Sequence, residues 1–320
     1  MRIPSAAFAL LLCLAGGAAA EPGLASAYPG DRGLGADPRV VFFENFENGT
    51  VAELSPRWDE LKNPDNLSLV SDAPAGSDGG HSLRIVSHGG VDTGGHVYTR
   101  LRGPQERLYV RYYVKYASGG TYHHAGAWLG GYNPPTSWPQ GGAGQRPEGN
   151  ERFTVGFEPA GPELRWDFYA YWMGMRPDGR GAFWGNSFIQ DASLRVRSDE
   201  WTCVEIMIEM NDPMDSTTGE LAAWIDGVRV AHLGPGFPTG SWSGGLFMPA
   251  PGSEPFEGFQ WRNDPALAIN FLWLQLYTTG DPPGHVGSMW FDQVVAATEY
   301  IGPISSGPPD RVPERPQLLE

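Results

Sequence analysis

Apolar and polar residues alternate with a period of two along much of this chain. The clearest case is the segment 164–173, which has an apolar side and a polar side: Leu164, Trp166, Phe168, Ala170 and Trp172 against Arg165, Asp167, Tyr169 and Tyr171. Because successive side chains of a strand point to opposite faces, this alternation predicts a half-buried β-strand. Two tyrosines on the polar face, where Lys, Glu or Thr are more usual, indicate a binding surface.

Eleven further segments show the same alternation or a short apolar run, and no segment of useful length has a helical period. They are Val40–Glu47, Ser82–Ser87, His96–Leu101, Arg107–Tyr116, His123–Gly130, Arg152–Glu158, Trp201–Met210, Leu221–Ile225, Val228–Leu233, Ile269–Tyr277 and Ser288–Ala297. Asp226-Gly227, between two apolar runs, predicts a tight hairpin. The pattern predicts an all-β fold, a jelly-roll sandwich of two antiparallel sheets.

The remaining stretches predict the domain boundaries. Residues 1–20 combine Arg2, an apolar core and a small-residue end at Ala20, which is typical of a cleaved export signal. Residues 21–38 are expected to be a flexible leader, 39–302 the single β-domain, and 303–320 a disordered Pro-rich tail. Three long non-repetitive stretches, 131–150, 174–199 and 234–266, are expected to rim a groove, because long loops in a compact domain are usually functional.

Charge and cysteine content limit the possible partners and functions of the chain. Loss of Arg2 with the signal leaves 21 basic and 37 acidic residues, a formal charge of −16. Nucleic acid and anionic membranes are therefore poor partners, and the excess negative charge also argues against a polyanionic substrate unless a local basic groove overrides it. The mature chain retains only Cys203, so no internal disulfide is possible. We expect a secreted or periplasmic monomer without membrane insertion, and a buried, unreactive Cys203.

Several strands carry Arg, Lys, Tyr, Trp or Gln opposite their apolar side, and this predicts the concave sheet of the sandwich. The groove residues expected from these strands are Arg111, Tyr113, Lys115, Thr154, Glu158, Trp273 and Gln275. Glu205 and Glu209 in 201–210 instead indicate a solvated convex face. His123 and His124 have opposite parity, so the apolar Ala125 and Ala127 place His124 with Trp128 on the groove side.

This set of side chains suits β-elimination of a uronate. The reaction needs a cation or amide at the carboxylate, a base for the C5 proton and an acid for the leaving oxygen. Tyr169 and Tyr171 are candidate acid–base groups, with His124 sharing the work. Candidate carboxylate neutralisers are Arg111, Lys115, Arg165 and Gln275, and the further substrate contacts are Tyr113, His123, Trp128, Thr154, Glu158 and Trp273.

Two other functions remain open on the sequence. A glycan-binding protein would use Tyr169, Tyr171, Trp128 and Trp273 for stacking. A glycoside hydrolase would need two carboxylates about 5–10 Å apart, for which Glu158 and Asp167 are the candidates. The acidic stretch 211–220 matches no EF-hand spacing, and we expect neither a metal nor a cofactor.

Five segments, spread over roughly residues 40–300, resemble the polysaccharide-lyase-like branch of the concanavalin A-like jelly rolls, which includes alginate and glucuronan lyases. Val41–Glu47 resembles the opening strand, and Leu108–Tyr116 followed by the Gly-rich His124–Gly131 resembles a characteristic strand pair. Asn211–Gly227 resembles the loop and WxDG hairpin of these enzymes, and Trp290–Pro303 resembles their closing strand.

The resemblance implies a jelly-roll lyase with long groove-rimming loops and a tyrosine pair that carries catalysis. Tyr169 and Tyr171 match that pair by position. The family's hairpin lysine is missing, and His124 or His123 stands nearest to its place. Where the family has Ser/Thr and Arg on the intervening strand, this chain has Thr154 and Gly156.

Overall fold

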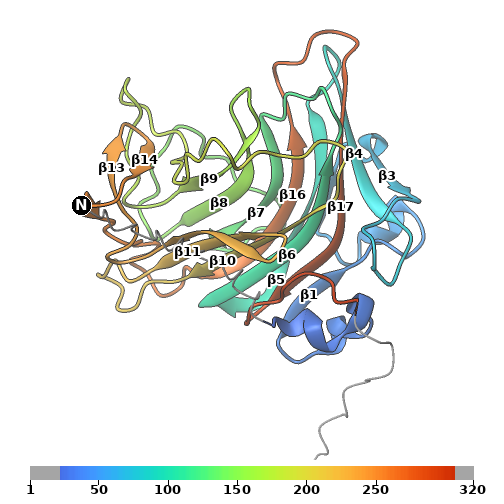
Figure 1. Cartoon of the computed structure of the whole chain (residues 1–320), viewed down its shortest axis with the longest axis horizontal. Helices are drawn as coiled ribbons and strands as arrows, with labels where there is room; N and C mark the ends of the chain where they lie inside the picture. Colours follow the sequence, from blue (N-terminus) through green and yellow to red (C-terminus); the bar gives the residue numbers. More distant parts are fainter. Residues whose placement is uncertain (1–21, 307–320) are drawn as a thin grey trace, which may run out of the picture.

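The computed structural model describes residues 22–306, and within this range the chain folds as two antiparallel sheets packed face to face (Figure 1). The predicted signal at 1–20 lies outside the described residues, as do residues 307–320 of the predicted tail. Apart from five short 3₁₀ turns, the regular structure of the described chain is entirely β. This confirms the predicted fold class.

The outer sheet contains eight strands. In spatial order they are β12 (Val228–Leu233), β11 (Glu220–Ile225), β10 (Thr202–Glu209), β6 (Arg107–Tyr116), β17 (Val286–Ala297), β4 (Ser82–His88) and β3 (Leu67–Val70), with β1 (Val40–Glu44) also paired to β17. Asp226 and Gly227 have φ of 50° and 78° in the β11–β12 turn, so the predicted tight hairpin is confirmed.

The inner sheet contains six strands and carries the groove. Its order is β2 (Glu60–Lys62), β5 (Gly94–Gln105), β16 (Ile269–Tyr277), β7 (His124–Tyr132), β8 (Arg152–Ala160) and β9 (Arg165–Tyr171). All twelve predicted strands are present, whereas the short β2 and β3 were not predicted, because three or four residues give too little alternation to recognise.

One core fills the space between the sheets. The apolar side of β6 contributes Leu108, Val110 and Val114, all fully buried, and Trp166 and Phe168 of β9 face them from the inner sheet. The two layers are also joined by hydrogen bonds. Tyr112 Oη donates to the carbonyl of Phe157 at 3.2 Å, and Tyr116 Oη to that of Ala125 at 2.8 Å. The apolar side predicted for 164–173 is therefore the core side.

The chain ends of the described region pack on the outer sheet. Residues 22–38, expected to be a flexible leader, contain the 3₁₀ turns η1 (Leu24–Ala27), η2 (Pro29–Asp31) and η3 (Leu34–Ala36), near β1 in Figure 1. Leu24, Leu34 and Ile301 share a small apolar cluster. The expectation of flexibility was wrong, because this Gly- and Pro-rich segment buries its few apolar side chains against β17.

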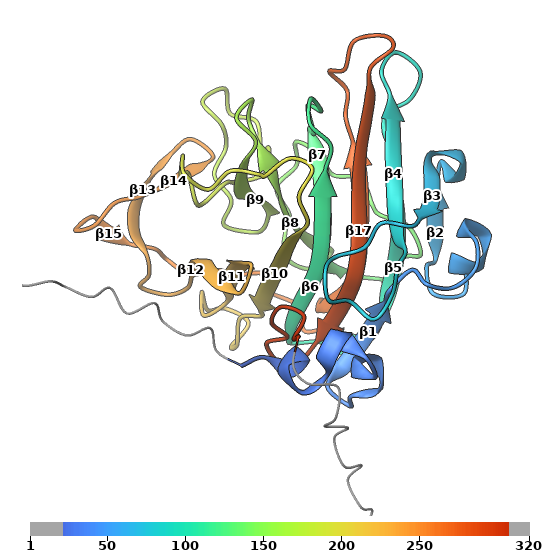
Figure 2. The ribbon, with the colours of Figure 1, turned by 45° about the vertical axis from the view of Figure 1, so that its right-hand side comes forward.

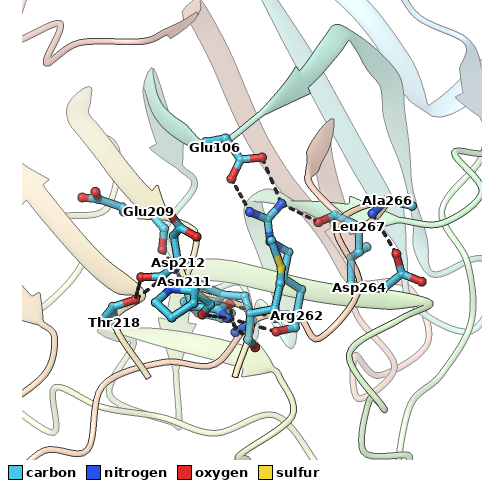
Figure 3. Close-up of polar contacts among 12 residues, drawn as sticks. Glu106, Glu209, Asn211, Asp212, Thr218, Arg262, Asp264, Ala266 and Leu267 are labelled. Atoms are coloured by element: carbon cyan, nitrogen blue, oxygen red, sulfur yellow. Dashed lines mark hydrogen bonds and ion pairs between the residues drawn. The ribbon is translucent and has the colours of Figure 1, made fainter. Parts of the chain in front are cut away.

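The segment 234–266 was expected to be a loop on the groove rim. It instead contains a small sheet of β13 (Thr239–Ser243), β14 (Leu246–Pro249) and β15 (Glu254–Pro255), at the end of the molecule opposite β2 and β3 (Figure 2). Figure 3 shows how its end is tied down: the buried Arg262 guanidinium bonds Glu106 and the carbonyl of Leu267. Asn211 Oδ1 accepts the backbone N–H groups of Trp261 and Arg262.

The two remaining 3₁₀ turns, η4 (Val51–Leu54) and η5 (Pro64–Asn66), flank β2 in the sequence. Thr50 and Glu53 form a reciprocal cap at the start of η4. Asn66 at the end of η5 donates to the carbonyl of Gly94 at 3.1 Å. This bond ties the connection after β2 to the edge of the groove.

Candidate functional site

A cleft of about 850 Å³ lies on the concave face of the inner sheet. Five strands, β5, β16, β7, β8 and β9, supply its floor, and the loops Pro139–Ala143 and Trp184 supply part of its wall. Two of the three long stretches predicted to rim the groove therefore do so. The third, 234–266, contributes no lining residue.

An aromatic row crosses the middle of the floor. The strand register pairs Trp273 with Trp128, Trp128 with Gly156, and Gly156 with Tyr169. A Cβ at Gly156 would lie 2.4 Å from Cε2 of Trp128. The indole therefore occupies the space above this glycine, which brings its ring centroid to 5.7 Å from that of Tyr169.

His124 has a buried carboxylate partner. Its Nδ1 lies 2.7 Å from Oε1 of Glu158, and Trp128 Nε1 donates to Oε2 of the same carboxylate at 3.0 Å. Burial lowers the pKa of His124, but the charge and hydrogen bond of Glu158 outweigh it, so the net pKa is raised. Glu158 is only 3% exposed and supports the site from beneath the floor.

The tyrosine pair lies beside this histidine. The ring of Tyr169 is 4.8 Å from that of His124 and 5.7 Å from that of Tyr171, centroid to centroid. Burial raises the pKa of Tyr169 above its usual value, and the neighbouring Tyr171 raises it further. Tyr169 therefore remains a protonated hydroxyl at neutral pH. Tyr171 Oη accepts a long hydrogen bond, 3.4 Å, from the backbone N–H of Gly144.

Gln275 and His96 form a second polar pair. They are cross-strand neighbours on β16 and β5, and both line the cleft. His96 Nε2 lies 3.0 Å from Oε2 of Glu60, yet burial lowers the pKa of His96. A neutral His96 donates its Nε2–H to Glu60, which leaves Nδ1 as an acceptor, so the Gln275 amide is the group of this pair that can donate to a bound carboxylate without a fixed charge.

His123 and Tyr277 lie at the end of the cleft beyond His124. The two histidine rings stack with centroids 4.3 Å apart, and the ring of His123 is 5.9 Å from that of Tyr277. Burial and the neighbouring His124 lower the pKa of His123. His124, Trp128, Tyr169 and Tyr171 thus occupy the groove side as predicted, and His123 lines it from the start of the strand.

The charge of the lining differs from that of the whole chain. Arg152 and Lys62 line the cleft together with three histidines, and none of the lining residues in the described chain is Asp or Glu. Thr154 on β8 pairs with Tyr171 on β9 and also lines the floor of the cleft. A strongly acidic protein therefore has a cleft in which the lining residues with formal charge are cations.

Three predicted site residues lie elsewhere. Arg111, Tyr113 and Lys115 project from β6 on the outer sheet, away from the cleft. Arg111 is fully buried against Asp31, and Lys115 pairs with Asp72. Alternation correctly predicted that these side chains lie opposite the core side of the strand. It does not tell to which of the two sheets the strand belongs, so the prediction that they lie in the groove was wrong.

The prediction of a solvated convex face was also wrong at one position. Glu205, expected to be solvated, is 2% exposed and accepts the backbone N–H groups of Ile301 and Gly302 at 2.7 and 2.8 Å. Burial raises its pKa to about 7. The terminal segments cover the side of the outer sheet that alternation alone would leave in water.

Arg165 and Asp167 share a face with the tyrosines but do not line the cleft. Asp167 is 3% exposed and accepts backbone N–H groups of Phe168, Phe188, Ile189 and Gln190. Arg165 lies at the start of β9, in a bridge with Arg195. The loop 186–195 therefore covers the start of β9 and removes both groups from the groove.

Sequence reasoning missed several lining residues. His96, Lys62 and Trp184 carried no signal of their own, because the register of β5 against β16 and the course of the loops decide their positions. Arg152 lies at the start of the predicted strand Arg152–Glu158 but was not predicted as a site residue. Its parity with Thr154 was the available signal.

The structure contains no evident metal centre: among residues 22–306, no group of three or more His, Cys, Asp or Glu is placed to hold an ion. No described helix is long and apolar enough to cross a membrane. Cys203 is buried, and burial raises the pKa of its thiol to about 12. The prediction that Cys203 is buried is confirmed.

Comparison with solved structures identifies the fold. No protein-family model and no curated protein matches the chain. A double mutant of alginate lyase Aly36B, solved in complex with alginate tetrasaccharide, matches with a TM-score of 0.55 at 13% identity, over 82% of this chain and 98% of that one. This chain has the alginate-lyase jelly-roll fold. Alginate lyase vAL-1 from Chlorella virus matches with a TM-score of 0.53 at 14% identity, over 81% and 99% of the two chains. The predicted resemblance is confirmed at the level of fold.

Proposed function

We propose that this chain is an exported polysaccharide lyase that cleaves a uronate-containing glycan by β-elimination. The observation that carries the proposal is the charge of the cleft: cations, histidines and tyrosines line it, without a carboxylate among the described lining residues, in a chain of formal charge −15. Such a local reversal of sign favours an anionic ligand. The alginate-lyase fold supports the same reaction class.

The chemistry requires three groups around one sugar. A base removes the C5 proton, the electron pair forms the C4–C5 double bond, and the C4–O bond breaks with protonation of the leaving oxygen. Hydrogen-bond donors at the C6 carboxylate stabilise the charge that develops before this bond breaks. The amide of Gln275, beside His96 on one side of the floor, supplies such a donor, and we assign the carboxylate to this side.

The proton transfers fall to the groups opposite. Tyr169 and His124 are in ring contact, and Tyr171 lies on the same face of β9. Because Glu158 raises the pKa of His124 and burial raises that of Tyr169, both give up a proton only at higher pH than the free side chains and suit the acid that protonates the leaving oxygen. Tyr171, next to the backbone N–H of Gly144, is assigned as the base.

Two alternatives remain in view. Hydrolysis needs two carboxylates at the bond, and Glu158 and Asp167, although cross-strand partners, are both buried beneath the lining. A non-catalytic glycan-binding protein is favoured by one feature, the pair of Trp128 and Trp273 with ring centroids 5.8 Å apart. A glycan-binding protein would bind the polymer without cleaving it, and this distinguishes it from a lyase.

The first prediction tests catalysis directly. We expect absorbance near 235 nm, from the unsaturated product, to rise with at least one of alginate, glucuronan, polygalacturonate and hyaluronan. Tyr171→Phe should lower kcat by about 10²–10⁴-fold, the usual effect of losing an acid–base group, while glycan binding persists. Tyr109→Phe, on the outer sheet, is the matched control and should leave kcat unchanged. Binding of a glycan without any absorbance rise would instead establish the binding protein.

A further inference from the structure

The concave face is open at one end and covered at the other. On β16, Tyr277 is 39% exposed, whereas Phe271, six residues earlier on the same face, is fully buried. The neighbouring strands follow the same trend. Tyr98 on β5 and Tyr132 on β7 are also fully buried, and their rings stack on Phe271 at centroid distances of 5.5 and 4.6 Å.

The loop between β7 and β8 provides the cover. On the β5 side, Tyr98 Oη donates to the carbonyl of Thr136 at 3.1 Å. On the β9 side, Gly144 contacts Tyr171 and forms a backbone bridge to Phe183. The segment Thr136–Gly144 therefore runs from one side of the floor to the other, and its middle, Pro139–Ala143, lines the cleft.

Chain length leaves this segment little freedom to run elsewhere. Four strand spacings separate β5 from β9, a span on the order of 19 Å. Eight residue steps from 136 to 144 reach at most roughly 26–29 Å. The loop must therefore cross the strands almost directly. It forms a wall over the Phe271 end of the floor.

Arg152 lies at the foot of this wall. The residue is 8% exposed, lines the cleft, and holds its guanidinium 5.9 Å from the ring of Tyr171. Its Nη2 donates to the carbonyls of Gly142 and Gln145 at 3.5 and 2.9 Å, which are neutral acceptors. The carboxylate beside it, Glu151, is 3.9 Å from Nε, beyond hydrogen-bond distance. The buried charge is therefore incompletely compensated.

A second polar group also lacks a protein partner. Trp273 lines the cleft, and its buried Nε1–H has no acceptor among the described residues. A buried donor without an acceptor is costly, and a sugar oxygen would satisfy it. The cleft thus holds a cation without a hydrogen-bonded carboxylate at its wall and a free donor in the middle of its floor.

Resting on the proposed lyase activity, we propose that the cleft is blind and that the enzyme acts from chain ends. The wall of residues 136–144 crosses the strands, so a polymer that lies along the strands cannot occupy the whole floor, and one terminus of a uronate chain enters and stops against the wall. Arg152 binds the carboxylate of that terminal sugar, on the far side of Tyr171 from Gln275 and His96. The cleft volume of about 850 Å³ is that of a pocket for a small ligand, which suits a few sugar units.

Product size over time tests this mode in the full wild-type chain. The probe is whichever of the four polymers named above gives the largest rise at 235 nm, analysed by size exclusion at low conversion. We expect one short unsaturated product from the first minutes while the residual polymer keeps its size and viscosity. A broad ladder of long unsaturated fragments with an early loss of viscosity overturns the blind cleft yet leaves the lyase standing. No absorbance rise with any polymer removes the basis of both proposals.

Arg152→Gln tests the terminal subsite. We expect KM for the polymer to rise by about tenfold or more, as for loss of a charge-assisted contact, with a smaller change in kcat. Arg100→Gln, on β5 and paired with Asp59 outside the cleft, is the matched control, and Arg152→Lys should recover part of the loss. Equal KM values for the two glutamine variants overturn the role of Arg152. If Arg152→Gln does not fold, Arg152→Lys decides instead: an unchanged KM for this variant overturns the need for the guanidinium fork.

Discussion

Glu158 sets the protonation of the site without touching the ligand space. Its carboxylate bonds both His124 and Trp128 from below the floor, so one buried residue fixes the tautomer of the histidine and the orientation of the indole. A carboxylate was expected at this position as a substrate contact or hydrolytic group. Its burial changes the role to that of a positioning residue for His124.

Removing this charge should move the pH profile. Glu158→Gln lowers the pKa of His124, because the attraction that raises it is lost. Because protonated His124 is a proposed acid, the alkaline limb of kcat/KM should shift to lower pH. Glu220→Gln, which removes the carboxylate from the surface pair with His232, should leave the profile in place. A lower plateau with unshifted limbs would contradict the assignment.

At the scale of elements, sequence reasoning succeeded where alternation is long. The core faces of β6, β8, β9 and β16 follow from period two. Sequence reasoning failed where pairing between distant strands decides the position of a residue. β6 belongs to the outer sheet, so Arg111 and Lys115 lie outside the site. His96 lies in the site because its strand pairs with β16 in a register that places it beside Gln275. Alternation encodes the two faces of a strand, whereas strand order and loop course depend on contacts between distant segments.

The β8 strand offers a test of how backbone shape supports the site. Gly156→Ala places a methyl group 2.4 Å from the Trp128 ring, so the indole must shift and its bond to Glu158 weakens. Overpacking of this kind costs about 1–3 kcal/mol, measured by denaturant unfolding, and glycan binding should weaken with it. Gly80→Ala, with open space around its new Cβ, is the control. Equal stability of the two variants would show that the ring adapts freely.

Buried acidic side chains hold the terminal segments of the described chain against the outer sheet. Glu205 holds the backbone at 301–302, and Asp31 pairs with Arg111. Burial also raises the pKa of Asp292, which lies in β17, to about 8. A carboxyl group whose folded pKa exceeds its unfolded value favours the folded state less as pH rises between these two values.

Stability should therefore fall between pH 5 and pH 8, in part through Glu205. Its pKa rises from 4.5 to about 7, which corresponds to roughly 3 kcal/mol at 1.36 kcal/mol per unit. Glu205→Gln should reduce the loss in unfolding free energy across this interval by up to that amount. Glu209→Gln, on the same strand but only partly buried and paired with Arg107, is the comparison. Parallel pH curves for wild type and Glu205→Gln would refute the titration.

The sign reversal between cleft and exterior also bears on how a cleaved fragment leaves. Under the proposed lyase activity, each elimination would release a piece that retains its uronate charges, and the net negative charge of the chain would repel it over a distance of about 8 Å in physiological salt. The cations of the cleft would hold the bound polymer against this repulsion, and a departing fragment would lose that attraction once it leaves the cleft. The excess of acidic over basic residues in the chain would thus favour turnover by limiting rebinding of product.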